Sequence, residues 1–260
     1  WWAAELDSHP SIDVQPLVEA RRWHQELWKR SVAVDFASPQ SDLTAYKVIV
    51  LPNQYALSDA AIDSLSSFVN AGGVLVATYF SGIADERDHI RLGGYPGALR
   101  DLLGLRVEEF FPLEQGGRIR LSDFGEGAIW SELGSASSAT VLAAYAEGPV
   151  EGSPAITRNG VGHGSAWYVG TQLSTAGLAQ LMEELLAQAA VVPVVPGLPN
   201  GVEAISRSSQ DETFLFLINH TTSDVRIDAS GTDLISGREG SEFTVDAGGV
   251  AVVRSARDDG

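Results

Sequence analysis

The chain has 260 residues, of which 44% are hydrophobic and 20% charged, proportions typical of a folded globular protein. Its formal net charge of −17 argues against binding to nucleic acid or to anionic membranes, because both depend on Lys and Arg side chains that neutralise phosphates. The absence of cysteine excludes disulfides, thiolate nucleophiles and thiolate metal sites, and it agrees with the cytoplasm, the compartment we predict. The chain opens on Trp1-Trp2 instead of methionine, so we expect it to be a piece of a longer protein.

The first part of the chain alternates between helix and strand patterns. Apolar residues at nearly helical spacing, and short apolar runs between them, mark these elements. Helices are expected at 17–29 and 58–69, and strands at 32–36, 46–52 and 74–79. Ser58 can cap the second helix. A strand, a helix and a strand with short connections predict two parallel strands, so this part is α/β.

A long loop over 81–97 and a short helix over 98–103 follow. After them, strands are expected at 107–113, 118–121, 140–146, 155–158 and 165–170, with a turn at 160–164. The helix at 174–190 has the clearest pattern, because its leucines and Met182 recur at i, i+3, i+4, i+7 and i+8 and form one apolar face.

The segment 191–201 holds three prolines and two glycines, a composition typical of a stiff linker. After it the pattern changes to strands alone, expected at 202–206, 213–219, 225–229, 243–245 and 250–254. Closely spaced strands with turn residues between them predict a small antiparallel sandwich or barrel. We therefore predict two domains, 1–195 and 196–260.

The loop after the strand at 74–79 is the place where many α/β hydrolases carry a nucleophile. Ser81 stands there without the flanking glycines of a nucleophile elbow, so a hydrogen-bonded loop hydroxyl is the favoured interpretation. The five histidines show no metal-ligand spacing, and no glycine loop matches a nucleotide-binding motif. No carboxylate pair stands out as the two acids of a glycosidase. Asn219-His220-Thr221 fits the N-glycosylation pattern.

Several stretches together resemble glycoside hydrolase family 42, the β-galactosidases. They are residues 1–11 (WWAAELDSHPS), 34–36 with 42–46, 78–86 (TYFSGIADE), 91–97 (RLGGYPG), 106–110, 201–204 and 214–220. This resemblance implies a trimerisation domain with a class I glutamine amidotransferase-like, flavodoxin-like three-layer fold, followed by a small β-sandwich domain. It also implies that the catalytic barrel and both its glutamates lie outside the chain, so no catalytic residue, cofactor or metal is expected here. The family's domain usually begins with a strand just before the tryptophan pair, so we expect either that a neighbouring element fills this place in the sheet or that the sheet has an exposed slot there.

The leading hypothesis is thus a non-catalytic assembly region whose partners are its own copies in a homotrimer and the barrel of its own polypeptide. The residues expected at a subunit interface or beside the active site are Trp1, Trp2, Tyr79, Phe80, Asp85, Glu86, His89, Arg91 and Tyr95. For the aromatic residues among them, a place in the core is the alternative. Two other functions stay open, an amidotransferase-like hydrolase that uses Ser81 and a carbohydrate-binding module.

Overall fold

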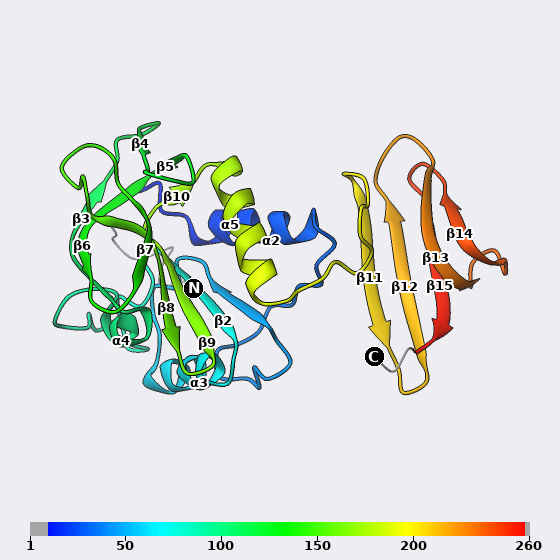
Figure 1. The fold of residues 1–260 in the computed structure, drawn as a ribbon, viewed down its shortest axis with the longest axis horizontal. Coiled ribbons are helices and arrows are strands. Elements are labelled where there is room, and N and C mark those ends of the chain that lie inside the picture. Colours follow the sequence, from blue (N-terminus) through cyan, green and yellow to red (C-terminus); the bar gives the residue numbers. More distant parts are fainter. Residues whose placement is uncertain (1–9, 258–260) are drawn as a thin grey trace. The chain divides into compact units, whose positions relative to one another are not determined.

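The computed structural model describes residues 10–257 and divides the chain into two units, shown in Figure 1. The first unit takes in the chain up to Trp23 together with Phe36–Val191. The second consists of His24–Asp35 and the chain from Val192 onward. Each unit has its own hydrophobic core, so each is described by itself.

The first unit is built on a mixed five-stranded sheet with the order β1-β2-β9-β8-β7. Its strands are β1 (Val48–Leu51), β2 (Val74–Thr78), β9 (Gly164–Val169), β8 (Pro154–Val161) and β7 (Thr140–Ala144). β1, β2 and β9 run parallel, and β8 and β7 are antiparallel to their neighbours. Helix α3 (Asp59–Asn70) connects β1 to β2, which confirms the predicted strand–helix–strand unit. Ser58 caps α3 as expected, since its side chain accepts a hydrogen bond from the backbone N–H of Ala61.

Helices cover both faces of this sheet (Figure 1). Leu65 and Val69 of α3 pack in one core cluster with Ala166 and Tyr168 of β9. Successive residues of a strand point to opposite faces of the sheet. Ser165 directly precedes Ala166 in β9, so its side chain lies on the opposite face from Ala166 and Tyr168. There Gln188 of α5 (Thr175–Gln188) donates a hydrogen bond to the Ser165 hydroxyl at 2.7 Å. The unit is therefore a mixed α/β layered structure.

Smaller elements complete the first unit. They are α2 (Pro16–Trp28, whose last turns belong to the second unit), the 3-10 turn η1 (Gly97–Leu99), α4 (Arg100–Leu103), β3 (Leu105–Pro112), β4 (Arg118–Arg120), β5 (Glu126–Ala128), β6 (Trp130–Ala136) and β10 (Gln172–Leu173). β3 pairs with β6, and β10-β5-β4 form a three-stranded sheet. The sequence did not predict β5 or β6, because glycine and serine interrupt their apolar pattern, nor β10, which has only two residues.

The predicted strand at 32–36 is wrong, because these residues are irregular in the structure. No described strand pairs with this segment or with the outer edge of β1, and strand geometry is stabilised by ladder hydrogen bonds to a neighbour. Phe36 at the end of the segment is 82% exposed.

The second unit contains one antiparallel five-stranded sheet with the order β11-β12-β15-β13-β14. Its strands are β11 (Val202–Ser208), β12 (Glu212–Asn219), β13 (Val225–Asp233), β14 (Glu239–Val245) and β15 (Val250–Ala256). All five expected strands are present, but hydrogen bonds join them into a single sheet, where a two-sheet sandwich or a closed barrel was expected. A register shift in β13 between Asp228 and Gly231 lets this strand pair with β14 along its length and with β15 at its end.

Candidate functional site

The loop that follows β2 holds most of the predicted site residues. It leaves β2 through a tight turn in which Phe80 and Gly82 have φ angles of 58° and 66°. Ser81 in this turn is fully buried, and its hydroxyl donates to the Leu51 carbonyl at 3.2 Å and accepts from the Gln54 N–H at 3.0 Å. A nucleophilic serine must reach a substrate and hand its proton to a base. The Ser81 hydroxyl bonds the backbone of Leu51 and Gln54 instead, which agrees with its interpretation as a hydrogen-bonded loop hydroxyl.

Five aromatic rings pack beneath this loop. Phe80 lies 5.4 Å from Trp130, Phe110 lies 4.9 Å from Trp130, and Tyr95 lies 4.3 Å from Phe110, measured between ring centroids. Tyr79, also against Trp130 at 5.9 Å, is 0% exposed and Phe80 is 4% exposed. Tyr79 and Phe80 are therefore core residues of the first unit, with almost no surface left to bury against another molecule. Tyr95 is half-buried at the edge of the cluster.

Asp85 organises the tip of the loop. Its Oδ1 accepts hydrogen bonds from the backbone N–H groups of Arg87 at 2.8 Å and His89 at 2.9 Å. These bonds, foremost that from His89, lower the pKa of the Asp85 carboxyl. The ring Nδ1 of His89 lies 3.4 Å from the other oxygen of Asp85. Asp85 and His89, expected together at the site, are thus in contact, while Glu86 is exposed beside them.

Arg91 fastens the loop to the start of α3. Its Nη2 lies 2.7 Å from Asp59 Oδ1 and donates to the Leu57 carbonyl at 2.8 Å. Its backbone N–H donates to Ile83, on the strand-like first limb of the loop, at 2.9 Å. Leu92, the next residue after Arg91, is 89% exposed. Trp1 and Trp2, the other predicted site residues, lie outside the described residues.

A buried carboxyl group that the sequence did not single out lies below the aromatic cluster. Glu132 of β6 is 1% exposed and accepts hydrogen bonds from Trp130 Nε1 at 2.7 Å and from the Tyr168 hydroxyl at 2.8 and 2.9 Å. Burial raises the pKa of Glu132 to about 7, against these hydrogen bonds, which lower it. Burial, together with the nearby Glu132, also raises the pKa of Tyr145 and of Tyr168 well above the usual value, so both phenols stay protonated.

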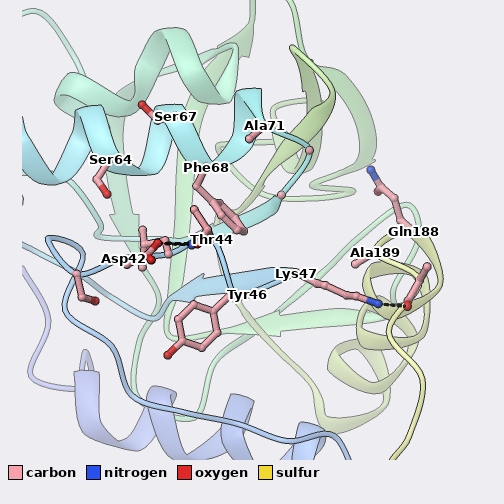
Figure 2. A pocket seen from close by; sticks show the side chains of 15 residues that line it. Asp42, Thr44, Tyr46, Lys47, Ser64, Ser67, Phe68, Ala71, Gln188 and Ala189 are labelled. Atoms are coloured by element: carbon pink, nitrogen blue, oxygen red, sulfur yellow. Dashed lines mark hydrogen bonds between the residues drawn. The ribbon is translucent and has the colours of Figure 1, made fainter. Parts of the chain in front are cut away.

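A surface pocket of about 580 Å³ lies between the start of β1, helix α3 and the end of α5 (Figure 2). Its charged groups are already engaged with the protein. Lys47 Nζ donates to the Ala190 carbonyl at 2.9 Å, and Asp42 Oδ1 accepts from the N–H and hydroxyl of Thr44 at 2.9 and 2.7 Å. Asp42 is the single carboxylate in this lining, so the pocket does not supply the two acids of a glycosidase.

The apparent glycosylation motif is a structural feature of the second unit. Asn219 is 1% exposed, and its Nδ2 donates to the carbonyls of Ser223, Val245 and Asp246. A side chain committed to three buried bonds is closed to a glycosylating enzyme in the folded protein. Within residues 10–257, no group of three or more His, Asp or Glu side chains could hold a metal ion, and no helix is long and apolar enough to cross a membrane.

Comparison with known proteins gives two family matches along the chain. Residues 1–192 match the model described as the β-galactosidase trimerisation domain, and residues 201–255 match the β-galactosidase C-terminal domain. A β-galactosidase from Arthrobacter sp is 44% identical over 97% of this chain and 36% of its own length. The β-galactosidase LacZ from Heyndrickxia coagulans is 40% identical over 93% of this chain and 37% of its own.

A solved structure gives the same picture. The crystal structure of β-galactosidase from Bacillus circulans sp. alkalophilus has a TM-score of 0.92 and 33% identity, over 98% of this chain and 40% of that one. The chain thus spans well under half the length of each of these three proteins.

Proposed function

The chain belongs to glycoside hydrolase family 42, in which it corresponds to the trimerisation and C-terminal domains of the β-galactosidases, and we propose that it is the non-catalytic assembly region of such an enzyme. In this proposal it builds the homotrimer of a longer polypeptide that hydrolyses terminal β-D-galactosides. The observation that carries the proposal is the consecutive match to these two domains over nearly the whole chain, in relatives that are more than twice as long.

The finer assignments belong to the same proposal. The first domain takes the amidotransferase-like three-layer fold, which the helices on both faces of the β1–β2–β9 sheet support. The boundary between the two domains falls between 195 and 196, which the proline-rich segment 191–201 supports. The enzyme works in the cytoplasm, which the lack of cysteine supports.

Within the assembly, the loop 81–94 lies beside the active-site entrance of a neighbouring subunit. What supports this is its fixed geometry, with Asp85 bonded to the backbone at the tip and Arg91 bonded to α3. The exposed Glu86 and His89 then stand where a substrate or a neighbouring subunit can contact them, and Tyr95 supports the base of the loop.

The central test compares this chain with the full-length protein by light scattering and by a galactosidase assay. We expect a trimer with activity for the full-length protein and no hydrolysis by the 260-residue chain. Hydrolysis of a galactoside by the purified chain would refute the non-catalytic assignment. Calorimetry of the chain with galactosides tests the carbohydrate-binding alternative, for which we expect no heat of binding.

The loop has its own test in the full-length enzyme. Asp85→Ala removes the acceptor that shapes the tip, and His89→Ala removes its side-chain partner. We expect a change in KM for a galactoside, or a weaker trimer, in both variants. Asp63→Ala, at an exposed position of α3, is the matched control. Unchanged kinetics and an unchanged trimer in both loop variants would refute the proposal that the loop 81–94 lies beside the active-site entrance of a neighbouring subunit.

A further inference from the structure

The second unit carries an apolar surface on the side of its sheet that faces away from its core. Side chains alternate along each strand, so one set points to the core and the other points outward. The core cluster contains Ala204, Leu217 and Val253, together with residues of β13 and β14. The outward residues of β11, β12 and β15 are absent from this core cluster and from the side chains packed against it.

These outward residues form one continuous patch, which we call the outer apolar face. It consists of Ile205, Phe214, Phe216, Ile218, Val250 and Val252. Their positions in the sheet make them neighbours, because Phe216 of β12 lies opposite Ile205 of β11 and opposite Val252 of β15, and Ile218 lies opposite Val250. Val250 is 47% exposed and the other five are partly exposed.

The other half of the same sheet provides an internal comparison. On β13 and β14 the outward positions are exposed and mostly charged or hydroxylated, namely Arg226, Asp228, Ser230, Glu242 and Thr244. This is the pattern expected of an antiparallel sheet with one face in water. The face of β11, β12 and β15 departs from it with two phenylalanines side by side along one strand. Contiguous apolar surface of this kind marks a contact with another part of a protein.

We propose that the outer apolar face is the docking surface for the part of the same polypeptide that precedes this chain. The proposal rests on the proposed function in one respect, that the chain works within a longer enzyme. The relatives extend well beyond the matched region, since the chain covers only 36% and 37% of two of them. Residues 201–255 match a domain described as C-terminal, so most of that additional length lies ahead of it in the relatives.

Symmetry favours this occupant over a second copy of the chain. A patch that binds the same patch on another copy does so about a two-fold axis and produces dimers, which do not build the trimer proposed above.

The test places a photo-crosslinking side chain in the full-length protein, through Phe216→p-benzoylphenylalanine, with Phe214→p-benzoylphenylalanine as a second position. Val141→p-benzoylphenylalanine is the control, because Val141 is an isolated apolar residue, 43% exposed, on β7 of the first unit. After irradiation, mass spectrometry identifies the joined peptides. Trimer mass and galactosidase activity of each variant are measured in parallel, so a failure of the proposed function is seen separately.

We expect crosslinks within one polypeptide, from position 216 or 214 to residues that precede Trp1, at a yield at least about fivefold above the control. Crosslinks between two copies, or to residues within this chain, would overturn the proposal. A yield at both positions no higher than that of the control would overturn it as well, because a docked face must lie within contact distance of its partner.

Discussion

Replacing the buried Glu132 by glutamine tests whether a neutral carboxylic acid lies at the centre of the first unit. Glu132 is fully enclosed, and the donors that contact its carboxyl, Trp130 Nε1 and the Tyr168 hydroxyl, carry no formal charge. A carboxylate without a cation in such a place loses hydration that neutral donors only partly replace, so the protonated form is favoured.

The size of the effect on the free energy of unfolding follows from the pKa of Glu132. Burial raises the pKa of Glu132 from 4.5 to about 7, so the folded state holds the proton more tightly than the unfolded chain does. The stabilising effect of this proton is complete below pH 4.5 and is lost as the pH rises toward 7. At 1.36 kcal/mol per pKa unit, the loss amounts to about 3 kcal/mol of the free energy of unfolding.

Denaturant unfolding of the 260-residue chain between pH 4 and pH 8 measures this effect, with fluorescence of the buried Trp130 and Trp167 as the probe of the first unit. Glu132→Gln should flatten the pH dependence by about 3 kcal/mol over this range, whatever the glutamine does to the absolute stability. Ser135→Ala, at an exposed position of the same strand β6 and without a titrating group, is the control and should leave it unchanged. Equal pH profiles for Glu132→Gln and the unmodified chain would refute the reasoning.

Three further substitutions test contacts elsewhere. Gly170→Ala would place a methyl group 2.9 Å from the Tyr145 hydroxyl, and chemical denaturation should show the first unit destabilised by about 1–3 kcal/mol; unchanged stability would contradict this packing. Arg91→Ala removes the bond to Asp59 and should speed hydrogen exchange of the 83–91 amides about tenfold, while exchange in β9 stays the same. Asn219→Ala leaves three carbonyls without their donor and should destabilise the second unit by about 3 kcal/mol, and a native-like melting curve would count against it.

Much of the architecture could be predicted from local patterns. The strand–helix–strand unit around α3 and the leucine face of α5 depend on short-range periodicity, which the sequence displays directly. The five C-terminal strands are likewise marked by alternating or continuous apolar runs between turn residues. The interpretation of Ser81 as a bonded loop hydroxyl needed only the absence of glycine two residues before it and two residues after it.

Strand pairing and burial that depend on residues far apart in the chain could not be predicted from the sequence. The segment 32–36 has a strand pattern, but no described strand pairs with it, so its residues stay irregular. The sequence left Tyr79 and Phe80 open between an interface and the core, and only the structure shows that Trp130, some fifty residues later, packs against both rings. Asn219 matched a surface modification motif, and only the loops around Val245 show that its amide is buried.

The sequence by itself therefore determined the α/β character of the first part and the strand-only character of the second, because these follow from periodicity and composition along the chain, and its resemblance to known members identified the family. Tertiary structure alone decided which carboxyl is buried, which aromatic rings are core and which side chains of the C-terminal sheet point away from its core. Those outcomes depend on residues far apart in sequence that meet only after folding, since burial and hydrogen bonding are properties of the packed chain.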